Sequence, residues 1–197
     1  MMKSKPEALP ASMAERIMDS AESLLAQRGY HGFSYDDVAQ QVGIKKPSIH
    51  HHFAKKEILA AAIVHRYSLG FQGHLKDIED TYNTVKARLK AYAELFQQTY
   101  QSERKLCVCG MLGAEAAALP VLVNQEVQNF FQMNLAWLTS IIATADSDGL
   151  DATRQQAECR AFVFLSVLEG SMVVGRGLQD RRGPIDVAQV WLGCFYP

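Results

Sequence analysis

The chain has 197 residues, of which 48% are apolar, and a formal net charge of -1 at pH 7. This apolar content excludes a disordered or fibrous protein, and the length allows one domain or a small domain joined to a larger one. Residues 1–66 carry 9 Lys and Arg against 7 Asp and Glu, whereas residues 67–197 carry 11 against 14. The weakly basic N-terminal part indicates an anionic partner at that end of the molecule.

The sequence gives no sign of a targeting segment or a membrane span. Its first residues lack the apolar run of a signal peptide, and no stretch approaches the roughly 20 apolar residues that a membrane helix needs. The four cysteines, at positions 107, 109, 159 and 194, have neither disulfide-scaffold nor zinc-ribbon spacing. We therefore expect a protein of the reducing cytoplasm with no membrane partner.

The first part of the chain predicts three short helices. Residues 1–11 contain two prolines and are expected to form a flexible lead. Ser12 and Glu15 form a capping box before an apolar stripe that Gly29 ends. A second helix begins at Ser34, and Gly43 supplies the turn into a third helix over residues 46–52. This order is typical of a helix-turn-helix.

The remaining segments also have helical periodicity and no strand pattern. We expect helices over residues 55–76, 82–100, 106–119, 121–145, 152–174 and from 184 onward, with a loop at 147–149. The 152–174 helix is apolar on nearly every side, so it must be covered on two faces. The fold class is therefore all-α with about nine helices. We expect residues 12–54 to form a three-helix domain and residues 55–197 to form a larger helical domain.

The stretch from Gly43 to Lys56 contains four lysines and three histidines but no acid. Such a helix suits the DNA major groove, with cations beside the phosphates. Lysine runs also occur on ordinary solvated faces, but this motif favours phosphate contacts by the lysines and base or sugar contacts by Ser48 and His50. The candidate DNA-binding residues are Ser34, Lys45, Lys46, Pro47, Ser48, His50, His51, His52 and Lys56.

The same stretch resembles the TetR family of transcriptional regulators. The elements that carry the resemblance are Ser34, Val38-Ala39, Gly43-Ile44, the run from Ser48 to Phe53, and the run from Lys56 to Leu59. His50 stands where the family often has Tyr, and Pro47 replaces a common Gly, which affects the preferred bases. The resemblance implies a homodimer, a palindromic double-stranded DNA operator, and repression lifted by a small molecule in the C-terminal core. It makes residues 12–54 the DNA-binding domain and residues 55–197 the ligand-binding and dimerisation domain. The 152–174 helix and the helix containing Trp191 would form the dimer interface.

Several residues of the C-terminal part could line an apolar ligand pocket, although for each one alone the plain core is the favoured interpretation. These are Phe96, Tyr100, Met111, Met133, Trp137 and Phe164, with Glu115 and Glu169 as groups that could orient a ligand. Cys107 and Cys109 follow Arg104 and Lys105, which could lower a thiol pKa. They are candidates for sensing oxidants or electrophiles, and buried structural thiols are the simpler interpretation.

Other functions are weaker hypotheses. His50, His51 and His52 are adjacent on a helix and point about 100° apart, so they cannot converge on one metal ion. We expect no metal and no cofactor. The sequence contains no nucleophile–base grouping and no phosphate loop, which argues against an enzyme. Two alternatives remain open: a repressor switched by Cys107 or Cys109, and a helical ligand carrier or enzyme that does not bind DNA.

Overall fold

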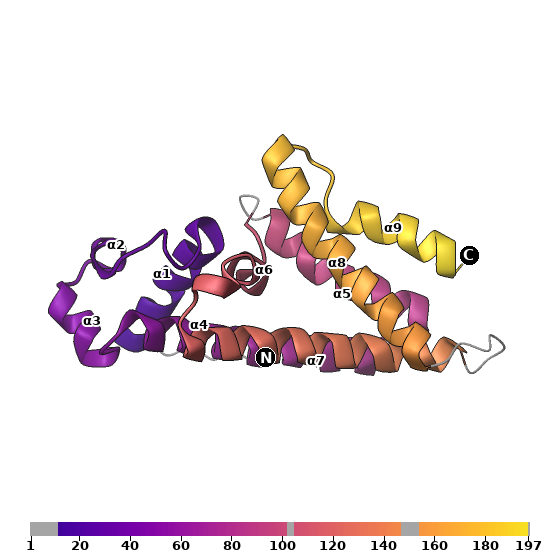
Figure 1. The fold of residues 1–197 in the computed structure, drawn as a ribbon, viewed down its shortest axis with the longest axis horizontal. Helices are drawn as coiled ribbons and strands as arrows, with labels where there is room; N and C mark the ends of the chain where they lie inside the picture. The colour runs from indigo at the N-terminus through magenta and orange to yellow at the C-terminus, as the bar shows by residue number, and fades with distance from the viewer. Residues whose placement is uncertain (1–11, 102–104, 147–153, 197) are drawn as a thin grey trace, which may run out of the picture.

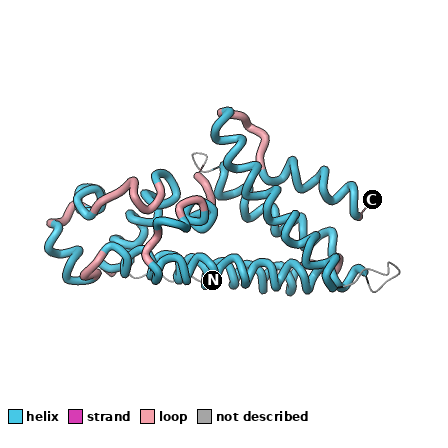
Figure 2. Tube along the Cα trace, viewed as in Figure 1, coloured by secondary structure: helices cyan, strands magenta, loops and turns pink. Residues whose placement is uncertain are grey.

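The computed structural model describes residues 12–101, 105–146 and 154–196. Across these ranges it contains nine α-helices, one 3-10 turn and no strand, so the all-α prediction is confirmed (Figures 1 and 2). The expected N-terminal lead at 1–11, the loop at 147–149 and Arg104 lie outside the described residues. The elements are α1 Met13–Arg28, α2 Tyr35–Val42, α3 Lys46–His52, α4 Lys56–Thr81, α5 Val85–Gln101, α6 Val108–Gly113, η1 Ala116–Ala118, α7 Val121–Asp146, α8 Arg154–Leu178 and α9 Pro184–Phe195.

The first helices begin and end where their capping residues lie. The Glu15 N–H donates to Ser12 Oγ at 3.2 Å, and the Ser12 N–H donates to Glu15 Oε2 at 2.6 Å. The capping box expected before α1 is therefore confirmed. Gly43 ends α2 in the left-handed conformation, with φ 76° and ψ 37°. Gly29 also has a positive φ of 74°, but its ψ of -177° is extended, so it turns the chain away from α1 without a left-handed cap.

Helices α1, α2 and α3 pack together at one end of the molecule, and we call them the head (Figure 1). Helix α4 leaves the head and lies along α7 on the long axis of the molecule. Helix α8 packs against α7 and α9, and α5 packs against α9. Helix α6 lies between the head and the C-terminal helices, where it contacts α1, α4 and α7. The head therefore packs against the rest of the described chain mainly through α4 and α6.

Aromatic side chains fill the centre of the C-terminal part. Phe71 of α4 makes edge-to-face contacts with Tyr92, Phe96 and Phe130, with ring centroids 5.3–5.9 Å apart. Phe164 of α8 packs against Trp191 of α9 at 4.6 Å. Edge-to-face and tilted rings at these distances add specific stabilisation to the burial of their area. These aromatic residues join α4, α5, α7, α8 and α9 into one core.

Two segments differ from the periodicity of the sequence. The helical stretch expected over 106–119 is divided into α6 and the short turn η1, and Glu115, which lies between them, accepts a hydrogen bond from the Tyr30 N–H of the head. Helix α4 continues to Thr81 through Gly70 and Gly73, where an added Cβ would meet no atom within 4 Å. These two glycines are therefore not required for close packing.

Candidate nucleic-acid interface

The helix-turn-helix is held together by its buried face. Ile49 of α3 is fully buried, and Phe53, one turn later, is nearly so. The hydroxyl of Tyr35, in the first turn of α2, donates to the Phe53 carbonyl at 2.8 Å. Burial raises the pKa of Tyr35 to about 12, so this hydroxyl keeps its proton near neutral pH. The end of α3 is therefore fixed to the start of α2.

The Ser34 side chain caps α2. Asp37 accepts hydrogen bonds from the N–H and the hydroxyl of Ser34 at 2.7 and 2.6 Å. These bonds, more than the ion pair with Arg28 at 3.6 Å, hold the pKa of Asp37 below its usual range. An acid at the start of a helix also interacts favourably with the helix dipole. The serine expected to mark this interface is thus committed to helix capping.

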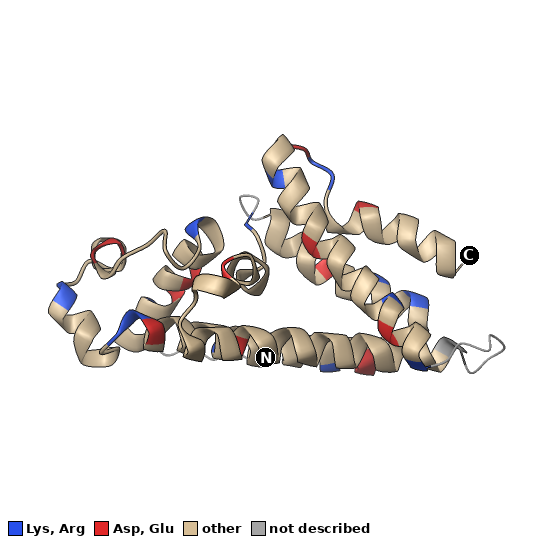
Figure 3. Ribbon diagram, viewed as in Figure 1, with Lys and Arg blue, Asp and Glu red and all other residues tan. Residues whose placement is uncertain are grey.

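The outer face of α3 is exposed and polar. Lys45, Pro47, Ser48, His51 and His52 are all exposed. Basic residues lie at both ends of α3, whereas the acids of the head are on α1 and α2 (Figure 3). Pro47 occupies the first turn, where its missing N–H leaves no intrahelical bond unmade. The side of α3 opposite Ile49 therefore presents donors and positive charge to solvent.

Two of the expected interface residues have partners within the head. Lys46 Nζ lies 2.8 Å from Asp36 Oδ2 in an exposed ion pair. His50 Nδ1 lies 3.1 Å from the Ala54 carbonyl, and its ring contacts that of Tyr35 at 4.9 Å. Exposed ion pairs contribute only about 0–1 kcal/mol, so Lys46 can exchange its partner at little cost. His50 is more strongly oriented than the two histidines that follow it.

Lys56 points into the head. Its ammonium donates to the Phe33 carbonyl at 2.5 Å and lies 4.6 and 4.3 Å from the ring centroids of Tyr30 and Phe33. Burial of the ammonium lowers the pKa of Lys56, and the charges of Glu115 and Asp37 oppose that shift. Lys56 therefore ties the start of α4 to the turn between α1 and α2.

Four polar contacts join α1 and the turn after it to the helices that follow the head. The guanidinium of Arg66, on α4, binds Asp19 at 2.7 Å and Glu22 at 2.6 Å on α1. Arg176, near the end of α8, donates to the Gln27 carbonyl at 2.7 Å. Glu115, between α6 and η1, accepts from the Tyr30 N–H at 2.8 Å. Sequence periodicity gave no signal for these contacts, because each joins residues at least 44 positions apart.

The residues expected to line a ligand pocket are divided among several places. Phe96, Tyr100 and Phe164 are buried in the core, and the Tyr100 hydroxyl donates to the Asp180 carbonyl at 3.1 Å. Met111 is partly buried against the same core. Met133 and Trp137 line a cavity of about 600 Å³ between α4 and α7, and the Trp137 N–H donates to Glu79 at 2.6 Å. They do not form a single pocket.

A second cavity lies next to the contacts between the head and α4. It has a volume of about 390 Å³ and is lined by Glu22 of α1, by Arg66, Tyr67 and Phe71 of α4, and by residues of α5. A neighbouring cavity of about 310 Å³ shares Glu22, Tyr67 and Thr99 with it and extends to the start of α6. A molecule in this region would contact both α1 and α4.

Cys107 and Cys109 are both buried, next to two polar side chains from other helices. The Tyr67 hydroxyl lies 3.6 Å from Cys107 Sγ. Glu169, from α8, lies against Gly110, and its Oε1 has no hydrogen-bond partner among the described residues. The structure thus brings the expected thiols together with Glu169, which sequence reasoning had assigned to a ligand pocket.

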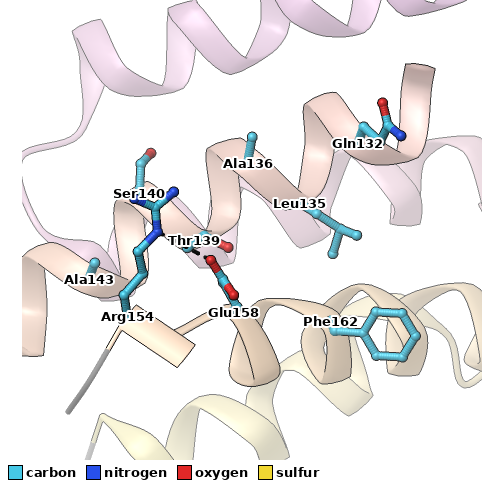
Figure 4. A pocket seen from close by; sticks show the side chains of 9 residues that line it. All are labelled: Gln132, Leu135, Ala136, Thr139, Ser140, Ala143, Arg154, Glu158 and Phe162. Carbon is cyan, nitrogen blue, oxygen red and sulfur yellow. Dashed lines mark hydrogen bonds and ion pairs between the residues drawn. The ribbon is translucent and has the colours of Figure 1, made fainter. Parts of the chain in front are cut away.

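One face of α8 and α9 is apolar and exposed. Phe162, Val173, Val174 and Leu178 of α8 are 56–67% exposed, and Val190 of α9 is 71% exposed. We call these residues, with Val163, the α8–α9 apolar face. A groove of about 800 Å³ between α7 and α8 reaches Phe162, and an Arg154–Glu158 ion pair of 3.2 Å lies at its other end (Figure 4). Isolated exposed apolar residues are common, but a continuous stripe of them indicates an interaction surface.

The expectation that no segment could span a membrane needs a correction. By length and composition alone, α8 is apolar enough to cross one. In the structure, α8 packs against α7 and α9 along one side, and its other side belongs to the α8–α9 apolar face. The run of apolar residues arises because two different faces of one helix are apolar.

Comparison with known proteins shows which proteins share this sequence and architecture. The family model of bacterial regulatory proteins, tetR family, matches residues 17–63, which cover most of the head and the start of α4. The biofilm operon icaADBC HTH-type negative transcriptional regulator IcaR of Staphylococcus epidermidis is 25% identical over 121 residues. That match covers 61% of this chain and 62% of the relative, which is less than two thirds of its length.

Two solved structures resemble almost the whole chain. A TetR-family transcriptional regulator from Agrobacterium tumefaciens is 29% identical with a TM-score of 0.82, over 89% of this chain and 92% of that one. A TetR transcriptional regulator from Legionella pneumophila is 28% identical with a TM-score of 0.84, over 92% and 96%. The match therefore includes the C-terminal helices as well as the head. The head and the start of α4 therefore match the tetR family of bacterial regulatory proteins, and the whole chain has the fold of TetR-family regulators.

Proposed function

We propose that this protein is a transcriptional repressor that binds a palindromic DNA operator as a homodimer and is released by a small molecule. The observation that carries the proposal is the exposed outer face of α3, which is polar and basic and is fixed to α2 through Tyr35 and Phe53. A recognition helix needs such a face toward the major groove and a rigid support behind it. An operator also implies that the protein works in the cytoplasm, where the DNA is.

The exposed residues divide into two roles. Lys45 and Lys46, with Lys55 after α3, contact phosphates, and the exposed Asp36 partner of Lys46 is replaced by a phosphate on binding. Ser48, His51 and His52 reach bases or sugars from the outer face of α3. His50 and Pro47 shape the ends of that helix. Ser34 and Lys56 act from within the head, one as a cap and the other through the Phe33 carbonyl.

The α8–α9 apolar face is the proposed dimer interface. Its open glycines, Gly170 and Gly177, have no atom within 4 Å of an added Cβ, so a second helix can approach closely. A twofold axis through this face would bury the same residues of both subunits. It would also place two recognition helices on half-sites about one helical turn, or roughly 34–36 Å, apart.

The effector site is proposed in the cavities between α1, α4 and α5. Arg66 lines the larger cavity and binds Asp19 and Glu22 of α1. A ligand that inserts beside Arg66 changes the contact between α1 and α4, and with it the separation of the two heads. For release, the ligand must bind more tightly to the dimer whose heads are too far apart or too close together for the operator. A ligand that binds equally to both head separations does not change their populations.

Selection from a randomised double-stranded DNA pool tests the proposal. We expect an enriched palindrome, with affinity falling as salt rises by a slope of roughly 0.9 per phosphate neutralised. The half-site spacing of the selected sequences then gives the dimer geometry. Salt-dependent binding without a consensus would contradict sequence-specific recognition. No binding would contradict the repressor and favour a ligand carrier or an enzyme.

A further inference from the structure

Arg176 of α8 forms a direct connection between that helix and the end of α1. Its Nη2 donates to the Gln27 carbonyl at 2.7 Å, although the two residues are 149 positions apart in the chain. Within the described residues, α8 packs against α5, α7 and α9 and has no comparable packing with α1. The connection is therefore made by one long side chain and not by a helix–helix interface.

The Gln27 carbonyl is well suited to a positively charged donor. It lies in the last turn of α1, where carbonyl groups lack intrahelical donors and the aligned peptide dipoles leave a partial negative charge. A guanidinium supplies both a donor and the opposite charge. Its other terminal nitrogen, Nη1, is buried and has no hydrogen-bond partner among the described residues, so this side of the guanidinium lies out of water. In such surroundings a hydrogen bond is stronger than one exposed to solvent.

The backbone of Arg176 is fixed by the way in which α8 ends. Gln179 follows the helix in the left-handed region, with φ 56°. The Asp180 N–H donates to the Gly175 carbonyl at 2.9 Å, and the Gln179 N–H donates to the Arg176 carbonyl at 3.2 Å, which is the Schellman pattern of a helix end. The Tyr100 hydroxyl of α5 holds the Asp180 carbonyl at 3.1 Å. The base of the arginine side chain therefore moves only if the end of α8 moves.

The same two turns of α8 carry part of the α8–α9 apolar face. Val173 and Val174 precede Arg176, and Leu178 follows it. The residues proposed to meet a second copy and the residue that holds α1 thus share one rigid segment. The contacts of Arg66 and Glu115 with the head come from α4 and from the segment after α6, so they are one helix further from this face.

We propose that Arg176 is a positioning residue, whose hydrogen bond to Gln27 sets the angle of the head relative to α8 and thereby the half-site spacing that the dimer recognises. The effect on spacing rests on the proposed repressor function, whereas the angle of the head within one chain does not. Without this bond, the head stays attached through α4 and α6 but turns more freely about them. Loss of spacing selectivity, more than loss of binding, is the consequence.

Operators built from the selected half-sites, with the spacer lengthened or shortened by one base pair, measure this selectivity. One base pair moves a half-site by about 3.4 Å and turns it by about 35°. We expect the wild type to bind the selected spacing at least tenfold more tightly than the others, and Arg176→Gln to bind all three within about threefold. An equal loss of affinity at every spacing, with unchanged selectivity, would mean that Arg176 only stabilises the head and would overturn the proposal.

Two further variants identify the hydrogen bond as the cause. Arg88 of α5 donates to the Tyr82 and Glu79 carbonyls at the end of α4, so Arg88→Gln removes the same kind of contact without touching the head. It is the matched control and should keep the selectivity of the wild type. Arg176→Lys keeps a cationic donor for a single carbonyl and should keep most of it. A lysine variant as unselective as Arg176→Gln would overturn the role of the hydrogen bond.

A distance within one chain tests the angle of the head without DNA. Spin labels are placed at two exposed positions, Gln40→Cys on α2 and Gln128→Cys on α7, in a chain whose two exposed cysteines are replaced by serine. The labelled chain is diluted with unlabelled protein, and the distance distribution is measured by pulsed electron paramagnetic resonance. We expect the distribution to broaden in Arg176→Gln and not in Arg88→Gln. An unchanged distribution in Arg176→Gln would overturn the inference, whereas broadening without any DNA binding would count against the repressor alone.

Discussion

The lysines around α3 have different surroundings, which give them different roles. Lys45 is exposed and Lys46 has only an exposed ion pair with Asp36, so both are available to phosphates. Lys56 is held by the Phe33 carbonyl and two aromatic rings. All three belong to one basic stretch of sequence, and only their neighbours in space distinguish the proposed DNA contacts of Lys45 and Lys46 from the structural contact of Lys56.

Substitution separates these two roles. Lys45→Gln should weaken operator binding and reduce the slope of log affinity against log salt by about 1, because one phosphate contact is lost. Lys56→Gln should instead lower the free energy of unfolding, because the Phe33 carbonyl loses its charged donor. Fluorescence anisotropy at several salt concentrations and thermal unfolding measure the two effects. An unchanged salt slope in Lys45→Gln would remove that residue from the phosphate contacts.

Titration of the thiols tests the charge state of the cluster around Cys107. Burial acts to raise the pKa of the Cys107 thiol, but hydrogen bonds, first among them one from Cys109, outweigh burial and lower this pKa to about 6. The Cys107 thiolate therefore forms between about pH 5 and 7, whereas an ordinary thiol titrates near about 8.5. We expect a step of thiolate absorbance in the far ultraviolet with its midpoint near pH 6. Cys107→Ser should lose this step. Cys109→Ser should keep it, because a serine hydroxyl can still donate to the sulfur.

At the scale of the helices, the sequence predicted most boundaries of the head. Ser12 with Glu15, Ser34 and Gly43 act locally, so their effect on the chain could be inferred without a structure. The recognition helix was predicted over 46–52 and is observed as Lys46–His52. The segment around α6 was harder to predict, because it ends where Glu115 binds Tyr30, which is 85 positions away in the chain.

The candidate site was predicted less completely than the helices. The acid-free basic stretch identified the exposed face of α3, because charge and spacing are visible in a sequence. The inward direction of Lys56 and the contacts of Arg66 with α1 depend on which helices meet, and local patterns carry no information on that. The grouping of Glu169 with Cys107 likewise requires α8 to pass beside α6 at Gly110.

Tyr35 provides a test of the contact between α2 and α3. Tyr35→Phe keeps the buried ring but removes the hydroxyl that donates to the Phe53 carbonyl. Leaving that buried carbonyl without a donor should cost about 1–3 kcal/mol of stability. Urea unfolding of the two proteins gives the difference. Surface substitutions commonly change the free energy of unfolding by up to about 0.5 kcal/mol. A decrease no larger than that in Tyr35→Phe would mean that water replaces the hydroxyl as donor.

At the scale of the whole molecule, the arrangement of helices leaves one large apolar surface uncovered. Helices α5, α7 and α9 bury one side of α8, and the α8–α9 apolar face remains open to solvent in a single chain. A second copy that covers this face would fix the distance between the two heads. In the proposed dimer, specific operator binding would therefore depend on residues at the opposite end of the protein from α3.

A charge on this face should separate the subunits. Val174→Glu places an acid in the centre of the α8–α9 apolar face, where burial in a dimer would leave it unpaired, at a cost of several kcal/mol. We expect sedimentation to give a monomer and operator affinity to fall at least tenfold. Gln72→Glu, at an exposed position of α4, a helix that carries no residue of this face, is the matched control and should remain dimeric. A dimeric Val174→Glu would place the interface elsewhere.

The inward lysine at the start of α4 has a consequence for local unfolding. Lys56 holds the turn between α1 and α2, and Tyr35 holds the end of α3, so no helix of the head can open without breaking a contact with another. Hydrogen exchange should therefore reach the amides of α1, α2, α3 and the first turn of α4 through one shared opening. We therefore expect the head to unfold as a single cooperative unit. Its amides should be protected from hydrogen exchange for as long as the start of α4 stays folded.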